Sequence, residues 1–163
     1  MKNNKKIVDY NGQEKSISCI GCARERGEIA TGNIMKTKYF DVHQDFETPI
    51  SGFVIVSSRR HIKSIDEFTK PEQKDFIKLL IKIRTTLRKV LKIKIVYLIQ
   101  KEDTSHHFHI WLFSRHNWME KQFGKNLKSI DPIIKFARES LKTKNNIKKV
   151  EKDIEKLKKF LKK

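Results

Sequence analysis

Clusters of hydrophobic residues predict a set of β-strands in this 163-residue chain. Residues 39–45 and 53–57 are rich in β-branched and aromatic side chains, which is typical of strands. Two similar runs, residues 93–100 and 106–113, flank the polar segment KEDTS and together predict a β-hairpin. We expect these strands to form an antiparallel sheet.

A long helix is predicted after Thr69. Thr69 and Glu72 have the spacing of a capping box, in which each side chain accepts a hydrogen bond from the backbone N–H of the other residue. The apolar residues that follow recur every three or four positions, as on one face of a helix: Phe76, Leu79, Leu80, Ile83, Leu87, Val90 and Leu91.

Two further helices are predicted beyond residue 115. One opens at Asp131-Pro132. The other carries a narrow apolar stripe, which consists of Ile147, Val150, Ile154, Leu157 and Leu161. Lysines flank this stripe, so it suits packing against one neighbouring element as well as contact with nucleic acid.

These elements predict an α+β fold with an antiparallel sheet, one long helix packed against it and a helical C-terminal extension. The first 33 residues read as irregular, apart from a hairpin turn at Asn11-Gly12. We expect one domain over residues 1–115 and place the helical extension, packed on it, at 116–163.

The charge of the chain favours polyanionic partners. There are 37 Lys and Arg against 19 Asp and Glu, a formal net charge of +18. Such an excess suits nucleotides, nucleic acid or anionic lipid, although a generally Lys-rich surface explains it equally well. No apolar run approaches the length of a membrane span, and the start lacks the apolar core of a signal peptide. We therefore expect a cytoplasmic protein without a membrane segment.

Three of the six histidines crowd into the segment His106-His107-Phe108-His109. On a strand, His107 and His109 point to one face while Phe108 points to the other, because strand side chains alternate. A neutral imidazole is a good nucleophile towards phosphorus near neutral pH. The plain alternative is a pair of solvated strand histidines without a chemical role.

The only two cysteines, Cys19 and Cys22, form one C-x-x-C motif. In a reducing compartment this motif indicates metal binding or redox chemistry rather than a structural disulfide. Two thiols without any ligand are the remaining alternative.

The histidine segment resembles the signature of the histidine-triad family, His-φ-His-φ-His-φ-φ, where φ is apolar. His107-Phe-His109-Ile-Trp111-Leu-Phe matches it with Trp111 in the third His position. The segment from Pro49 to His61, PISGFVIVSSRRH, is similar to the family pattern P-x-x-G-H-x-L-V-I-P-K-x-H. The match covers roughly residues 19–115 in the expected order of elements. It implies a histidine-triad fold and a nucleotide hydrolase or transferase similar to the diadenosine-polyphosphate hydrolases.

The resemblance implies a role for each matching residue. His109, the middle His, is implied as the nucleophile that carries the nucleotidyl group, with His107 and Trp111 beside it. Thr104 lies where the family places a Ser or Thr near the leaving group. The implied nucleotide-binding residues are Asp45 and Phe46 at the ribose, Gln100 at the phosphate, and Arg115.

Trp111 is the main departure from the family pattern. The third His of the pattern contacts the bridging oxygen and assists the leaving group. Trp111 can donate one N–H but cannot shuttle a proton. The related galactose-1-phosphate uridylyltransferases use Gln there, so we expect activity with an altered rate or leaving-group preference.

A zinc site is implied by the same resemblance. Bacterial family members bind zinc with a C-x-x-C pair, the His of the K-x-H segment and the first His of the triad. Here these ligands are Cys19, Cys22, His61 and His107. Four protein ligands leave no open position, so we expect a structural ion.

The resulting hypothesis is a phosphohydrolase or nucleotidyl transferase acting at the α-phosphate of dinucleoside polyphosphates or nucleoside phosphoramidates. One alternative is aprataxin-like removal of adenylate from nucleic-acid ends. Another is a non-catalytic nucleotide- or nucleic-acid-binding module. We expect a homodimer, as is common among triad relatives, with extra contact from the stripe between residues 147 and 161.

Overall fold

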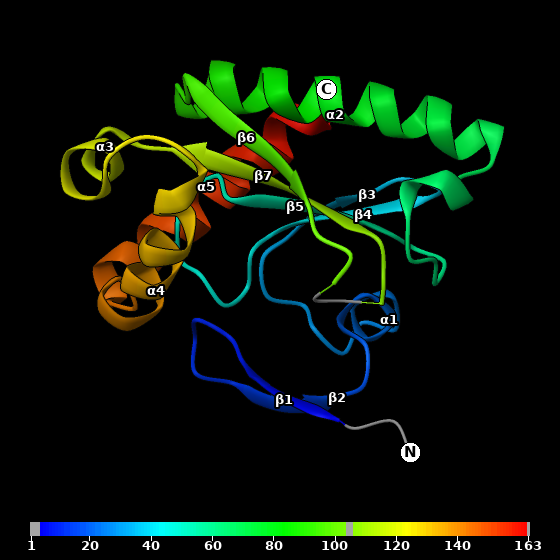
Figure 1. The fold of residues 1–163 in the computed structure, drawn as a ribbon, viewed down its shortest axis with the longest axis horizontal. Helices are drawn as coiled ribbons and strands as arrows, with labels where there is room; N and C mark the ends of the chain where they lie inside the picture. The colour runs from blue at the N-terminus through cyan, green and yellow to red at the C-terminus, as the bar shows by residue number, and fades with distance from the viewer. Residues whose placement is uncertain (1–3, 104–105, 163) are drawn as a thin grey trace.

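A five-stranded antiparallel sheet forms the centre of the protein in a computed structural model, which describes residues 4–103 and 106–162. The strand order is β3-β4-β5-β7-β6 (Figure 1). The strands are β3 (Asn33–Lys36), β4 (Phe40–Gln44), β5 (Val54–Ser58), β6 (Ile95–Gln100) and β7 (His109–Arg115). The α+β class and the antiparallel sheet are thus confirmed.

Helices α2 (Lys70–Leu91) and α5 (Lys144–Leu161) cover one face of the sheet. The capping box at Thr69 and Glu72 is present at the start of α2, as predicted. The core under these helices contains Val56 and Phe108 from the sheet. Burial of the apolar sides of both helices against this face is the main stabilising contribution in this half of the protein.

The apolar stripe of α5 lies inside this core. Val150 and Leu157 are buried among the side chains of α2 and the sheet. The interpretation that the stripe contacts nucleic acid or a second copy of the chain was therefore wrong. Because the stripe packs against the sheet and α2 of the same chain, its apolar side chains are not available to another molecule.

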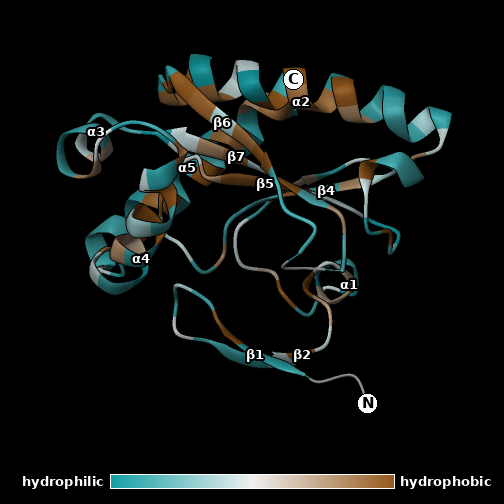
Figure 2. Ribbon diagram, in the orientation of Figure 1, coloured by the Kyte–Doolittle hydropathy of each residue, from teal (hydrophilic) through white to brown (hydrophobic). Residues whose placement is uncertain are grey.

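The other face of the sheet is covered in two parts. At one end, α3 (Asn117–Phe123) and α4 (Ile130–Ser140) pack on Phe53 and Phe113. At the other end lie a hairpin of β1 (Lys5–Val8) and β2 (Glu14–Ile17) and the short helix α1 (Ile20–Glu25). Figure 2 shows that the central strands are mostly hydrophobic, whereas the helices carry hydrophobic and hydrophilic residues in alternation.

The prediction of an irregular N-terminal segment was only partly right. The hairpin around Asn11-Gly12 forms, but α1 is present as well, and the unpredicted strand β3 begins where this segment ends. Helix α1 has only six residues and no clear apolar period, so a tertiary contact must hold it. Arg24 supplies that contact through a buried ion pair with Asp41 on β4. Among the described residues, no helix is long and apolar enough to cross a membrane.

Candidate metal centre and nucleotide cavity

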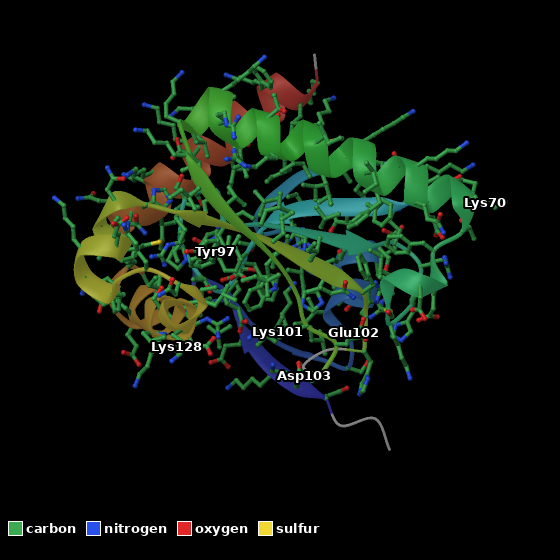
Figure 3. All side chains as sticks on the ribbon, turned by 45° about the horizontal axis from the view of Figure 1, so that its top comes forward. Lys70, Tyr97, Lys101, Glu102, Asp103 and Lys128 are labelled. Atoms are coloured by element: carbon green, nitrogen blue, oxygen red, sulfur yellow. The ribbon has the colours of Figure 1, made fainter. Side chains whose placement is uncertain are left out.

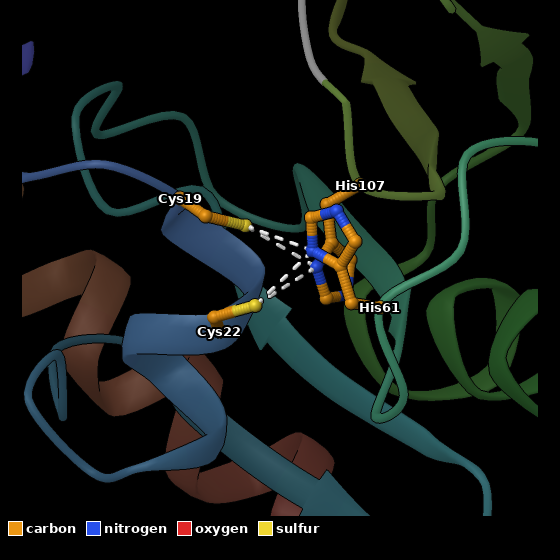
Figure 4. Close-up of side chains that lie close together, drawn as sticks. All are labelled: Cys19, Cys22, His61 and His107. Carbon is orange, nitrogen blue, oxygen red and sulfur yellow. Dashed lines mark hydrogen bonds between the residues drawn. The ribbon is translucent and has the colours of Figure 1, made fainter. Parts of the chain in front are cut away.

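Four potential metal ligands from three distant segments converge between α1 and the sheet (Figure 4). Their ligand atoms all lie within 4.8 Å of one another, and the residues are Cys19, Cys22, His61 and His107. The sulfur atoms lie between 3.2 and 3.7 Å from the Nδ1 atoms of the two imidazoles. In a tetrahedral zinc site, sulfur and nitrogen ligands are about 3.6 Å apart. The donor set and its spacing therefore fit zinc.

The hydrogen bond of His107 to the backbone orients this ring for a metal. Its Nε2 atom lies 2.7 Å from the carbonyl oxygen of Ser58. Because a carbonyl only accepts, Nε2–H donates, and the lone pair of Nδ1 faces the cysteine sulfurs. Burial, with His61 and His109 nearby, lowers the pKa of His107 and favours the neutral ring. A hydrogen bond from the ring nitrogen that does not face the metal is typical of metal-binding histidines.

Gly21 allows α1 to approach this centre. A Cβ atom at position 21 would overlap the imidazole ring of His107. Any residue other than glycine would therefore push the helix away from the ring or turn the ring. The Cys-Ile-Gly-Cys sequence thus supplies two ligands, and its glycine leaves room for the imidazole of His107.

A cavity of about 210 Å³ lies next to this centre on the same face of the sheet. Its wall includes His107, His109, Trp111, Asp45 and Phe46. The cavity thus brings together five of the residues to which the sequence analysis assigns a catalytic or nucleotide-binding role. The indole of Trp111 stands edge-on to the ring of Phe53, with 5.4 Å between the ring centroids.

His109 is held in one tautomer by the backbone. Its Nδ1 atom lies 3.0 Å from the carbonyl oxygen of His107, so Nδ1–H donates. The lone pair of the neutral ring then lies on Nε2, on the cavity side of the sheet. This arrangement is what a nucleophilic imidazole requires.

The carboxylate of Asp45 is buried at the cavity wall. Its Oδ1 atom accepts hydrogen bonds from the backbone N–H groups of Thr48 (2.7 Å) and Glu47 (3.1 Å). Burial raises the pKa of Asp45, and the nearby Arg138 opposes this shift. Since a carboxylate has about four acceptor sites, Asp45 keeps capacity for further donors.

Two of the predicted nucleotide-binding residues are absent from the cavity wall. The guanidinium of Arg115 donates to the Gly124 carbonyl and the Ser129 hydroxyl, so it connects β7 to the segment between α3 and α4. Gln100 pairs with Ile110, whose side chain packs on the face opposite to His109. The predicted Thr104 lies outside the described residues.

Several residues of the cavity wall were missed by the sequence analysis. Arg138 reaches it from α4 and donates to the Thr48 hydroxyl and the Glu47 carboxylate. His43 also lines the cavity, and burial together with Arg24 lowers its pKa. Ser57 and Lys101 lie in the wall as well. No motif marks these positions, because they join the site only through strand register and helix packing.

No protein-family model matches this sequence, and no curated protein matches it. Solved structures do match. A zinc-bound histidine triad family protein from Mycobacterium smegmatis is 15% identical, with a TM-score of 0.62 over 89% of this chain and 94% of that chain. A Hit-like protein involved in cell-cycle regulation from Bartonella henselae is 14% identical, with a TM-score of 0.59 over 87% and 95%. A HIT family member from Bacillus subtilis is 18% identical, with a TM-score of 0.57 over 85% and 95%. The chain therefore has the histidine-triad fold that the sequence predicted.

Proposed function

We propose that this chain, which has the histidine-triad fold, is a nucleotide phosphohydrolase or nucleotidyl transferase. Its substrates are dinucleoside polyphosphates or nucleoside phosphoramidates, and cleavage occurs at the α-phosphate. One observation carries the proposal: the His107 carbonyl accepts the Nδ1–H of His109, which leaves the Nε2 lone pair at the cavity that Asp45 and Phe46 also line.

The reaction proceeds in two displacement steps. In the first, Nε2 of His109 forms a bond to the α-phosphorus, and the bond from phosphorus to the leaving group breaks with its electron pair on the leaving atom. An amine leaving group takes up a proton from solvent in this step. In the second, water or another acceptor attacks the same phosphorus, and the P–N bond breaks with its electrons on Nε2. The acceptor loses its proton to solvent, and His109 returns to the neutral ring.

Asp45 and Phe46 are proposed to hold the nucleoside. The buried carboxylate of Asp45 has acceptor capacity for ribose hydroxyls, and the ring of Phe46 lies beside it in the same wall. A carboxylate that a turn already fixes in place loses little freedom on binding. This lowers the entropic cost of recognition.

The four-residue metal centre supports the same function from outside the cavity. Cys19, Cys22, His61 and His107 would hold zinc through two thiolates and two imidazoles. With every position taken by a protein ligand, the ion would supply structural stabilisation only. It would fix α1 on the sheet, and it would fix the His107 backbone that orients His109.

Trapping of the covalent intermediate tests the proposal. Wild-type protein, His109→Asn and the exposed neighbour control His106→Asn are incubated briefly with diadenosine tetraphosphate and measured by intact mass. We expect one adenylyl group on wild type and on the control, none on His109→Asn, and turnover of His109→Asn reduced by at least about a thousandfold. Near wild-type turnover by His109→Asn would contradict the covalent mechanism.

Nucleic-acid binding is a second candidate function, favoured by a run of positive charge that contains no acidic residue. Residues 76–100, from α2 through β6, contain seven Lys and Arg and no Asp or Glu. None of these seven makes an ion pair within the described residues. Lysines on a helix surface suit the phosphate backbone of a duplex.

Salt dependence tests this second function. If the α2 surface contacts phosphates, the logarithm of the affinity for a short duplex should fall with the logarithm of the salt concentration by about 0.9 per neutralised phosphate. Lys78→Gln combined with Arg88→Gln should reduce that slope by about two. A shallow slope in wild type, or an unchanged slope in the double variant, would remove this surface as a nucleic-acid contact.

A further inference from the structure

A row of three polar side chains crosses the sheet at the level of His109. Ser57 on β5 is paired directly with His109 on β7. The pairing of β6 with β7 ends at Gln100 and Ile110, so the next residue, Lys101, lies on the other side of His109. Directly opposite residues of antiparallel strands point to the same face. All three side chains accordingly line the same cavity.

The hydroxyl of Ser57 is buried without a hydrogen-bond partner among the described residues. Only 4% of this residue is exposed, yet it lines the cavity beside His109. A buried hydroxyl is destabilising unless something bonds to it. The location of Ser57 indicates that its partner is a group that enters the cavity.

Lys101 is held at the rim of the cavity by Trp111. Its Nζ atom lies 5.1 Å from the centroid of the indole, a cation–π contact, and 3.9 Å from a carboxylate oxygen of Asp131. Figure 3 shows Lys101 in the turn after β6, on the side of the sheet that faces away from α2. The ammonium is therefore held over Trp111, in the cavity wall that His109 also lines, although about a third of the side chain is exposed.

We propose that Ser57 and Lys101 bind the two non-bridging oxygens of the α-phosphate from opposite sides of His109. Ser57 donates its O–H and Lys101 donates an N–H, and both bonds are charge-assisted. Trp111 acts as a positioning residue that keeps the ammonium of Lys101 at the phosphate. This assignment rests on the proposed function, because it places a nucleotide α-phosphate at His109.

The two donors also suit the displacement itself. Attack by Nε2 moves negative charge onto the non-bridging oxygens of the α-phosphate. Donors already in place on both sides stabilise this charge without reorganising. No proton needs to move between Lys101 and the substrate for this effect.

Calorimetric titration with AMP and with adenosine tests the assignment, because the two ligands differ only in the phosphate. In Ser57→Ala and in Lys101→Met we expect the affinity for AMP to fall about tenfold or more, and the affinity for adenosine to stay within about twofold. Lys101→Arg should retain most of the affinity for AMP. Lys121→Met, an exposed lysine of α3, is the charge-matched control and should bind both ligands as wild type does.

Thermal unfolding shows whether the serine variant is correctly folded. Ser58→Ala is the matched comparison, because Ser58 is the next residue of β5 and its hydroxyl is also buried without a partner in the described part of the chain. Both substitutions remove an unsatisfied hydroxyl, so neither should lower the melting temperature in the absence of ligand.

The outcomes separate this assignment from the proposed function. If wild type prefers AMP and both Ser57→Ala and Lys101→Met keep that preference, the assignment is wrong while the proposed function stands. If the preference depends on both residues but no adenylyl-His109 forms, the phosphate site stands and the catalytic proposal fails. If wild type binds AMP no better than adenosine, both are overturned.

Discussion

The Nδ1 atom of His109 lies 3.0 Å from the carbonyl oxygen of His107. His107 thus has two roles, because its side chain lies in the metal centre while its backbone orients the nucleophile. A change at the metal centre is therefore expected to reach the chemistry through His107, which lies two residues before the nucleophile at the start of β7.

Zinc should be present at about one ion per chain in protein purified without chelator. Zinc that binds at a thousandfold excess over its Kd contributes about 4 kcal/mol. For a chain of this length, that is roughly 10 °C in melting temperature. Chelation should lower the melting temperature by about this amount, and activity should fall with it. Elemental analysis of wild type, Cys22→Ser and the control His106→Ala measures this, and equal, negligible zinc in all three would end the metal hypothesis.

Gly21→Ala should weaken the metal centre without touching a ligand. Alanine in a helix is more favourable than glycine by about 1 kcal/mol, whereas overlap in a packed site costs about 1–3 kcal/mol. Because the new Cβ would overlap the His107 ring, we expect a net loss of stability and reduced zinc content. A variant that is more stable than wild type and retains full zinc would show that α1 leaves room for a Cβ atom beside the His107 ring.

Arg24→Met should destabilise the fold by about 3–5 kcal/mol, since it leaves the buried carboxylate of Asp41 without its partner. Arg26 in the same helical segment is the matched control, because its pair with Glu28 is exposed. Arg26→Met should leave the stability close to that of wild type, because solvent screens this exposed pair. Denaturant unfolding measures both, and similar losses for the two variants would mean that the buried pair does not hold α1.

Trp111→His should retain activity, lowered by the loss of the indole that holds Lys101, and should favour poor leaving groups relative to good ones. An imidazole can give a proton to the leaving atom, which an indole cannot do, and general acid catalysis contributes about a hundredfold or more. The ratio of rates for a poor and a good leaving group should rise accordingly. Trp111→Phe keeps an aromatic ring under Lys101 and serves as the control. If Trp111→His left every rate unchanged, the residue would be a packing residue only.

The protein should form a homodimer through the edge of the sheet at β6. This strand ends the sheet, and the side chains of Ile95 and Leu98 on it are about half exposed. An apolar strand with an open edge is stabilised by pairing with a second copy. Sedimentation at micromolar concentration should give a dimer, and Leu98→Lys should shift it towards monomer. Ile77 on α2, whose exposed fraction equals that of Leu98, provides the control Ile77→Lys. A wild-type monomer under these conditions would refute the prediction.

The sequence by itself predicted four strands of the sheet, the helices α2, α4 and α5, and the faces of the central strands. Alternation along the strand separates Phe108 from His109, because successive side chains of a strand point to opposite faces. The capping box at Thr69 marks the start of α2 within one residue. Both signals depend on residues only a few positions apart, so no knowledge of the rest of the chain is needed to read them.

Tertiary structure decided which residues from distant strands share the cavity. Gln100 and Lys101 are neighbours in sequence, but the register of β6 against β7 places only Lys101 on the side of His109. Arg115 lies only six residues after His109. Its guanidinium nevertheless donates to Gly124 and Ser129, so it stabilises the segment between α3 and α4 instead of lining the cavity. Strand register and helix docking result from the packing of the whole chain. A local pattern cannot specify them, because the same short sequence can pair in more than one register.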